Sequence, residues 1–452
     1  MKRIYINELK DHVGETVEIA GFVDTYRDHG KLVFIDLRDL SGKVQMVALP
    51  NHEAAHKTAS ELKPEWVIAV TGKVNKRPEK MVNEKEANGS IEIEITAIEV
   101  ISKAAELPFE LSTDLNLDTY LDYLPITLRP EARRAVFKVQ AEILVAFRAF
   151  LNKERFTEFQ APKIVGGDAE GGAGVFHVDY LNGKTAYLAT SPQLYKQIMV
   201  GVFERVYAVG NVFRAEKHST TRHLNEYTSM DLEMGFIENH VDVMDMTGEL
   251  MHAVFDHLKK TCAHEFELLG ATLPAIPKHI PHMKLREAQK LLEKEHNVEI
   301  GDAPDLEPQH ERWLSEYAKK EFDSDFIFIT HFPITKTAFY AYEDPDDLGY
   351  SRYFDLLFRG IEIVSGGQRE HRYDTLVSKL TAKGLDPDKF SFYLQAFKFG
   401  LPPHGGFGMG LERLTEKFLE LDNVKKATLF PREINRIDTL LSLEENQEHA
   451  ED

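Results

Sequence analysis

Cysteine and long apolar runs are the features that this sequence most clearly lacks. Cys262 is the only cysteine among 452 residues, which excludes an internal disulfide and any zinc site made of several thiolates. No run of about 18 apolar residues is present, so no membrane-spanning helix is expected. The opening residues, MKRIYINELKDHVGE, lack the apolar centre of a secretory signal. We therefore expect a protein of the reducing cytoplasm.

Basic residues are also in deficit. The chain has 54 Lys and Arg against 74 Asp and Glu, which gives a net charge of −20 at pH 7. This balance argues against indiscriminate coating of DNA, although a local basic surface can still bind a nucleic acid. Acidic residues are dense in residues 439–452, where we expect a disordered, solvated tail. Hydrophobic residues make up 43%, which is enough for two or three domains with sizeable cores.

Residues 1–104 alternate apolar and polar residues in five segments, which predicts a small β-barrel. The segments are TVEIAGFV (16–23), KLVFIDLR (31–38), KVQMVAL (43–49), WVIAVTGKV (66–74) and IEIEITAIEV (91–100). A helix over residues 51–63 would separate the third and fourth strands, which is the layout of an OB-fold. OB-folds stack the bases of single-stranded nucleic acids on aromatic side chains of one face. Phe34 and Gln45, beside Arg27, are the candidates for this face, and a place for Phe34 in the barrel core is the alternative.

The pattern changes after the barrel. Residues 105–130 are interrupted by proline and lack a clear period, which predicts a hinge between domains. Residues 131–438 mix helical and strand patterns, and their first segment has apolar residues at helical spacing. The strand FTEFQAPKIVG follows, and its Pro162 suits an edge or interface strand. A long helix beside an edge strand favours a dimer face, although a buried helix explains the same pattern.

The stretch RVYAVGNVFRAEKHSTTRHLNEYTSMDLE (205–233) is the most informative in the chain. An apolar strand is expected to end at Arg214 and Glu216, and a second strand returns from Glu226. The polar loop between them carries four basic or titratable residues, Lys217, His218, Arg222 and His223. Arginine can bind phosphate oxygens bidentately and Tyr227 could stack on a base, so the hairpin suits a bound triphosphate. A solvated hairpin with cross-strand ion pairs is the alternative.

Charged residues also interrupt the apolar segment YFDLLFRGIEIVSGGQREH (353–371). Asp355 and Glu362 would lie near the two ends of a hairpin, and Ser365 follows. Carboxylate and hydroxyl oxygens are ligands that hold Mg²⁺ beside a polyphosphate. Arg369, after a Gly-Gly turn, could pair with a substrate carboxylate. Solvent-exposed strand charges are the alternative.

Two further segments carry glycine or proline beside charged residues. HGGFGMGLERL (404–414) predicts a Gly-rich turn that opens a helix, where backbone and Arg413 could approach an anion. YLATSPQLYKQIM (187–199) places Gln193 and Lys196 at a strand–helix corner, where Lys196 could hold a second carboxylate. The glycine-rich loop before it carries Glu170, which could close over a ligand and face an ammonium. A surface connection without such a role is the alternative.

Together these segments resemble the class II aminoacyl-tRNA synthetases, and specifically the aspartyl-tRNA synthetases. ERFTEFQAPKIV is similar to motif 1, VFRAE…TRHLNEYTSMDLE to motif 2 and GFGMGLERL to motif 3. SPQLYKQ and EIVSGGQREH are similar to the amino-acid-binding stretches of that family. The resemblance covers nearly the whole chain and is closest to the shorter, archaeal-style catalytic core. It implies an α+β multidomain protein, with an N-terminal OB-fold anticodon-binding barrel and an antiparallel β-sheet core flanked by helices.

The resemblance also implies a reaction. Aspartate attacks the α-phosphate of ATP, and the aspartyl group of the resulting adenylate then passes to the terminal ribose of tRNA(Asp). Charging of tRNA(Asn) by the same enzyme is left open. Mg²⁺ is the implied cofactor, and motif 1 implies a homodimer.

The same resemblance implies which residues act in the reaction, with Arg214 and Arg413 as the catalytic residues. The ATP site would comprise Arg214, Ala215, Glu216, Arg222, His223, Leu224, Tyr227, Glu362, Gly410, Leu411, Glu412 and Arg413. The aspartate site would comprise Glu170, Gln193, Lys196, Arg214, Asp231, Ser365 and Arg369. Mg²⁺ would be held by Glu362, Ser365 and Asp355, and the anticodon would be read by Phe34, Gln45 and Glu92.

The nearest alternative is an asparaginyl-tRNA synthetase. Lys196 and Arg369 would clamp the aspartate side chain, and a neutral amide would leave both cations unpaired at a cost of roughly several kcal/mol. A catalytically inactive relative that only binds tRNA or nucleotide is disfavoured, because the residues implied for ATP and Mg²⁺ are present. An ammonia-using asparagine synthetase is related in its core, but it would lack the N-terminal barrel that this sequence predicts, so it is disfavoured too.

Overall fold

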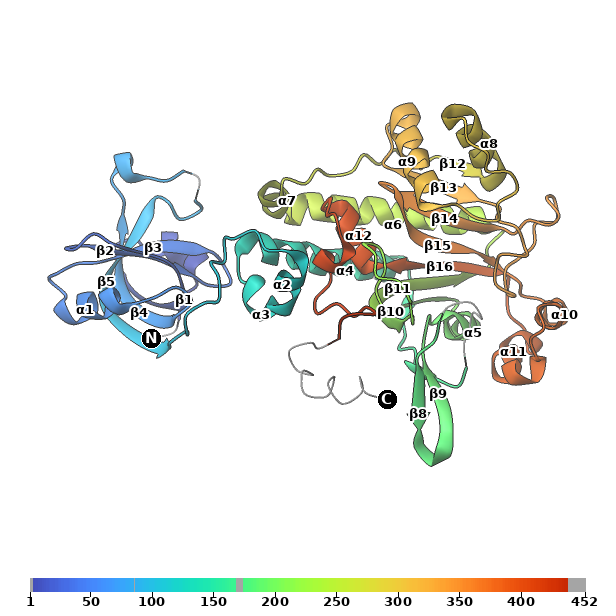
Figure 1. The fold of residues 1–452 in the computed structure, drawn as a ribbon, viewed down its shortest axis with the longest axis horizontal. Helices are drawn as coiled ribbons and strands as arrows, with labels where there is room; N and C mark the ends of the chain where they lie inside the picture. Colours follow the sequence, from blue (N-terminus) through green and yellow to red (C-terminus); the bar gives the residue numbers. More distant parts are fainter. Residues whose placement is uncertain (1–2, 85, 168–173, 438–452) are drawn as a thin grey trace. The chain divides into compact units, whose positions relative to one another are not determined.

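The computed structural model describes residues 3–84, 86–167 and 174–437 (Figure 1). Glu170 and the predicted tail lie outside these residues. The chain divides into two compact units, Met1–Thr113 and Asp114–Asp452. Within the described ranges, no helix is both long enough and apolar enough to cross a membrane.

The division between the units falls inside the segment 105–130, which we expected to be a hinge. The second half of this segment is helical, with α2 at Leu117–Asp122 and α3 at Leu124–Thr127. The side chains of Tyr120 and Leu121 pack together with Leu124 in a small core of their own. The helices were missed because each spans fewer than two turns, which is too short for a hydrophobic period to show.

The N-terminal unit is a closed five-stranded barrel with strand order β1-β2-β3-β5-β4. Its elements are η1 (Ile6–His12), β1 (Thr16–Asp28), β2 (Val33–Arg38), β3 (Lys43–Ala48), α1 (Glu53–Glu61), β4 (Val67–Lys76), η2 (Glu79–Met81) and β5 (Ile91–Ser102). The helix lies between the third and fourth strands, so the predicted OB-fold is confirmed. Strand β1 runs past the predicted end at residue 23, because a bulge between Val23 and Thr25 shifts the alternation there.

The second unit is built on an eight-stranded sheet with order β12-β13-β14-β15-β16-β11-β10-β6 (Figure 1). In the same order, the strands are His282–Lys284, Phe326–Thr330, Tyr353–Phe358, Ile361–Arg369, His404–Gly410, Glu226–Gly235, Arg205–Phe213 and Thr157–Glu158. Neighbouring strands pair antiparallel except at the two edges, where β12 pairs parallel with β13 and β6 pairs parallel with β10. The expected antiparallel core is therefore confirmed.

Helices α4 (Glu131–Lys153) and α6 (His240–Thr261) supply one large hydrophobic core with this sheet. The stripe on α4 includes Val139, Ile143 and Phe147, which are buried as the helical spacing predicted. The other elements of this unit are β7 (Ile164–Val165), β8 (His177–Tyr180), η3 (Leu181–Gly183), β9 (Lys184–Leu188), α5 (Gln193–Phe203), α7 (Ala263–Leu269), α8 (Leu285–His296), α9 (Pro308–Phe322), α10 (Tyr373–Ala382), η4 (Pro387–Phe390), α11 (Ser391–Lys398), α12 (Leu411–Phe418) and η5 (Val424–Ala427).

Two predicted elements differ in form. The segment FTEFQAPKIVG is not one strand, because Pro162 separates β6, at the edge of the large sheet, from β7 in a three-stranded sheet. The glycine-rich segment before α12 is the strand β16 and not a turn. A Cβ on Gly406 would come within 2.1 Å of the Leu232 carbonyl oxygen, so only glycine fits between the neighbouring strands there.

The Gly-Gly pair before Arg369 also lies inside a strand, β15. The turn of this hairpin is at Arg359 and Gly360, whose φ angles are +45° and +83°. Two successive residues with positive φ are typical of the two-residue turns that match the twist of a hairpin. Asp355 and Ser365 lie opposite each other across the hairpin, whereas Glu362 lies beside its turn.

Candidate active site

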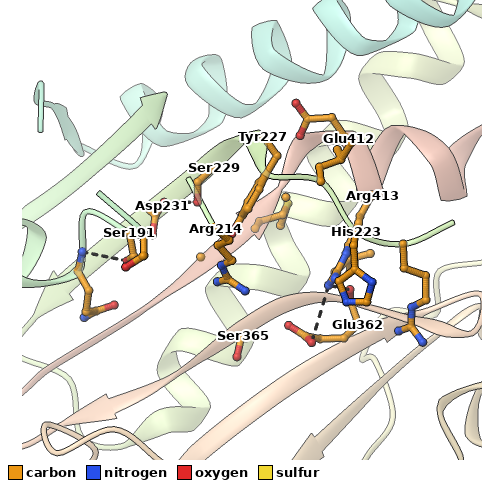
Figure 2. A pocket seen from close by; sticks show the side chains of 18 of the residues that line it. Ser191, Arg214, His223, Tyr227, Ser229, Asp231, Glu362, Ser365, Glu412 and Arg413 are labelled. Atoms are coloured by element: carbon orange, nitrogen blue, oxygen red, sulfur yellow. Dashed lines mark hydrogen bonds and ion pairs between the residues drawn. The ribbon is translucent and has the colours of Figure 1, made fainter. Parts of the chain in front are cut away.

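A cavity of about 350 Å³ lies over the central strands of the large sheet (Figure 2). The alternation of β11 explains its position: Met230 and Leu232 belong to the core with α4 and α6, whereas Ser229 and Asp231 line the cavity. The lining residues are Thr190, Ser191, Gln193, Arg214, Glu216, Arg222, His223, Leu224, Tyr227, Ser229, Asp231, Tyr340, Tyr353, Glu362, Ile363, Ser365, Arg369, Gly408, Met409, Gly410, Glu412, Arg413 and Val424.

Basic side chains from two segments meet at one end of the cavity. Figure 2 shows Arg413, at the start of α12, beside His223 and Glu362. Arg413 donates from Nη1 to the Glu362 carbonyl oxygen at 3.2 Å, and its distance to Glu362 Oε2 is 3.9 Å. Burial and the nearby Arg413 and Arg222 hold the pKa of His223 below its ordinary value. Of the predicted cations, Arg222, His223 and Arg413 line the cavity, whereas Lys217 and His218 are exposed and do not.

The middle of the cavity holds Arg214 and Tyr227, which the sequence predicted for nucleotide binding. The Arg214 guanidinium lies 5.6 Å from the centre of the Tyr227 ring. The antiparallel register of β10 and β11 brings the two together, because Arg214 follows the last residue of β10 and Tyr227 lies near the start of β11. Glu412 fixes the adjacent backbone, since the Thr228 amide donates to both of its carboxylate oxygens at 2.9 and 3.1 Å. Burial raises the pKa of Glu412 to about 7.

A buried network of ion pairs forms at the other end. Arg369 donates from Nε to Glu233 Oε1 at 3.0 Å and from Nη2 to the Gly406 carbonyl oxygen at 2.9 Å. Lys196 donates to Asp231 Oδ1 at 3.1 Å and lies 3.5 Å from Glu233 Oε2. Burial opposes ionisation of Glu233, yet Arg369 and Lys196 hold its pKa below the ordinary value. Two cations and two carboxylates therefore balance one another here.

The members of this network differ in their access to the cavity. Arg369, Asp231 and Gln193 line it, whereas Lys196 is fully buried and does not. Lys196 Nζ donates to Asp231 Oδ1 and, at 2.8 Å, to the Phe407 carbonyl oxygen. A direct contact between Lys196 and a bound aspartate stays a prediction.

The three residues expected at Mg²⁺ are close together, but only Glu362 and Ser365 line the cavity. Asp355 does not line the cavity, but it accepts a hydrogen bond from Ser365 Oγ at 2.8 Å. Burial, followed by the Glu362 charge, raises the pKa of Asp355 well above its ordinary value. Among the residues that the structure describes, no group of three or more His, Cys, Asp or Glu is arranged to hold a metal. One carboxylate and one hydroxyl fit Mg²⁺ best, because it takes few protein ligands and completes its shell with phosphate oxygens and water.

Several lining residues were missed by the sequence argument. Ser229 could have been found, because it alternates with Asp231 on the same strand. Tyr340 and Val424 follow no motif and reach the cavity only through the fold. Thr190, Ser191, Tyr353, Ile363, Gly408 and Met409 complete this group. Two residues predicted for ATP, Ala215 and Leu411, do not line the cavity.

The residues predicted for the anticodon share the outer face of the barrel. In β2, Val33 and Ile35 point into the core, whereas Phe34 is half-buried outside that core. Arg27 lies opposite Phe34 in the register and donates to Gln45 Oε1 at 3.3 Å. Gln45 in turn approaches Glu92 Oε2 at 3.5 Å. The alternative that Phe34 is a core residue is not supported.

Comparisons with known proteins agree with this architecture. Residues 17–101 match the family of OB-fold nucleic acid binding domains, and residues 116–434 match the family of class II tRNA synthetases (D, K and N). The chain is 46% identical to the aspartate–tRNA(Asp/Asn) ligase of Thermus thermophilus, across 96% of this chain and 99% of the relative. It is 45% identical to the ligase of the same name from Deinococcus radiodurans, across 97% and 99%.

A solved structure is also similar. The asparaginyl-tRNA synthetase of Pyrococcus horikoshii, complexed with asparaginyl-adenylate, superposes with a TM-score of 0.88 at 32% identity. The match covers 97% of this chain and 99% of that chain. The motifs, the fold and these relatives agree, and the chain belongs to the class II tRNA synthetases of the aspartyl, lysyl and asparaginyl group.

Proposed function

We propose that this protein is an aspartate–tRNA ligase, which joins L-aspartate to tRNA through an aspartyl-adenylate and releases diphosphate and AMP. The buried Arg369 at the floor of the cavity carries the proposal. Its hydrogen bonds to Glu233, Gln193 and the Gly406 carbonyl oxygen use Nε and Nη2, so the Nη1 donors can face a substrate carboxylate. Gln193 Nε2 is buried without a hydrogen-bond partner in the described part of the chain, and it offers a second donor. An acidic amino acid suits such a floor.

The first step needs placement and charge neutralisation, with no protein nucleophile. Arg214 would bind the α-phosphate and Tyr227 would pack on adenine, because both lie in the middle of the cavity. Arg222, His223 and Arg413 would hold the β- and γ-phosphates at its basic end. Mg²⁺, held by Glu362 and Ser365, would neutralise charge on the phosphate oxygens.

An asparaginyl-tRNA synthetase is the second candidate, because a protein with that activity shares the fold. Arg369 already pairs with Glu233, so a neutral amide would leave no cation unpaired. A carboxylate can accept at both of its oxygens, however, and so suits the Arg369 Nη1 donors and Gln193 Nε2 better than an amide, which has one acceptor oxygen. The higher identity to relatives named for aspartate also favours an acidic substrate.

We extend the proposal to both tRNA(Asp) and tRNA(Asn), because the two relatives reported above are named for both. The test is aspartylation of the two purified tRNAs, measured side by side with radiolabelled aspartate. We expect comparable kcat/KM for both. Charging of tRNA(Asp) alone would contradict the dual activity, and charging with asparagine alone would contradict the proposed substrate.

Two further features complete the proposal. Motif 1, ERFTEFQAPKIV, follows α4 and contains β6 and β7. We expect a homodimer through α4 and the edge strand β6, which sedimentation of the purified protein will measure. The single cysteine suits the reducing cytoplasm, where we expect the enzyme to act.

Replacing Phe34 with Ala is expected to lower kcat/KM for tRNA by about tenfold, because stacking of one base contributes about 1–3 kcal/mol. Aspartate-dependent pyrophosphate exchange should not change, because the proposed role is in tRNA binding only. Aminoacylation and exchange assays on the same preparation measure both quantities. Phe34→Tyr keeps an aromatic ring and should retain activity, and Leu40→Ala removes an exposed apolar residue as a matched control. A parallel loss of exchange would show that Phe34 supports the barrel instead.

A further inference from the structure

An ion pair at the wall of the cavity joins two segments that are 89 residues apart. Arg222, in the loop between β10 and β11, donates from Nη2 to Glu311 Oε2 on α9. Arg222 lines the cavity, and Glu311 does not. Glu311 thus contacts a residue of the proposed ATP site without belonging to that site.

Glu311 is held on a rigid element. It lies in the first turn of α9, which begins at Pro308 and packs Leu314 and Ala318 against strand β13. The residue is 8% exposed, which is unusual for a glutamate. A buried carboxylate requires a partner, and Arg222 supplies it.

The loop that carries Arg222 is anchored separately through its backbone. The Val424 amide donates to the Thr221 carbonyl oxygen at 3.0 Å, and Lys425 Nζ donates to Ser219 Oγ at 3.1 Å. These contacts place the loop beside η5, but none of them fixes the long side chain of Arg222. Among the residues that the structure describes, Glu311 is the partner that the guanidinium of Arg222 contacts.

We infer that Glu311 is a positioning residue for ATP: it holds the Arg222 guanidinium at the cavity wall, where its other donors face the polyphosphate. A guanidinium has five N–H donors, and the contact with Glu311 uses one of its two terminal nitrogens. Because the side chain is ordered before ATP arrives, its rotamer entropy is not lost on binding. This inference rests on the proposed function, which makes the cavity an ATP site.

The test is the KM for ATP in aspartate-dependent pyrophosphate exchange by the full-length Glu311→Ala variant. We expect this KM to rise about tenfold, the loss expected for one charge-assisted contact, while kcat and the KM for aspartate stay unchanged. Glu311→Gln keeps the shape and an acceptor oxygen, so it should restore part of the affinity. Glu316→Ala, on an exposed position of the same helix, is the matched control and should behave as the wild type.

A second background separates positioning from general support of the fold. In an Arg222→Ala protein, adding Glu311→Ala should cause no further rise in the KM for ATP, because the residue to be positioned is gone. An equal rise in both backgrounds, or a rise in the KM for aspartate too, would overturn the inference. A lower KM for ATP would also overturn it, since Glu311 would then be a competitor that ATP displaces. If Glu311→Ala does not fold, the KM for ATP of Glu311→Gln is compared in the same two backgrounds.

Failure of this inference and failure of the proposed function give different results. If the wild type shows no aspartate-dependent exchange, the proposed function is wrong. If the wild type exchanges normally and the variants keep its KM for ATP, only the role of Glu311 is wrong.

Discussion

Replacing Arg369 with Gln is expected to abolish aspartate activation while leaving ATP binding almost unchanged. Arg369 is 2% exposed, lines the floor of the cavity and lies at the end of β15, away from the basic end proposed for the phosphates. Loss of one partner from a buried charge pair costs about 3–5 kcal/mol, which is about three orders of magnitude in kcat/KM for aspartate. Pyrophosphate exchange measures kcat/KM for aspartate, and calorimetric titration with a non-hydrolysable ATP analogue measures the affinity for ATP.

The control for this variant addresses stability. Arg369 pairs with Glu233 at 3.0 Å, so Gln at position 369 leaves a buried carboxylate without its main partner. The double variant Arg369→Gln, Glu233→Gln removes both charges and should melt closer to the wild type. If the double variant is well folded and still fails to activate aspartate, the loss belongs to substrate binding. Exchange at the wild-type rate in Arg369→Gln would contradict the assignment of the aspartate site.

Replacing Arg214 with Gln is expected to lower kcat of the exchange reaction by about two to three orders of magnitude. Arg214 lines the same cavity as Arg369 and Arg413, and the α-phosphate is proposed to lie beside it. Charge develops on that phosphate as aspartate attacks it, and a missing donor at such a position costs about 10²–10³ in rate. Single-turnover formation of the adenylate measures the step directly.

Arg214→Lys distinguishes charge from geometry. Lysine keeps the cation but cannot bind two oxygens in a fork, so we expect only a partial recovery of kcat. A variant in which the KM for ATP rises and kcat stays unchanged would contradict a role in the transition state. Tyr227, which is itself assigned to adenine, lies beside the guanidinium, so Tyr227→Phe, which keeps the ring, should lower kcat far less than Arg214→Gln.

Much of the barrel followed from the sequence, because one face of each strand is buried and alternation is a local property. In β2 the apolar residues Val33, Ile35 and Leu37 point inward, and this placed Phe34 and Gln45 on a shared surface once the strands were aligned. The same local reasoning failed for β16. Glycines there favour a turn by composition, but the strand is selected by the close approach of β11 and β15 on either side.

The types of residue in the cavity were also visible in the sequence. Arginines after strand ends, a serine beside carboxylates and a tyrosine within the motif 2 segment indicated phosphate, metal and base binding. Their roles were assigned to single residues, however, whereas the structure shows pairs. Lys196 and Asp231, both assigned to the aspartate site, are in contact with each other at 3.1 Å.

The sequence alone determined the barrel and the family, whose resemblance implied the antiparallel core, and it predicted the arginines of the site, because hydrophobic periods and short motifs are set by neighbours along the chain. Only the tertiary structure decided which charges neutralise one another. Arg369 and Glu233 are 136 residues apart, and they meet because β16 pairs with both β15 and β11. Arg222 and Glu311 meet because α9 packs against the same sheet. Ion pairing depends on distance through space and on burial, and neither quantity is encoded in a local pattern.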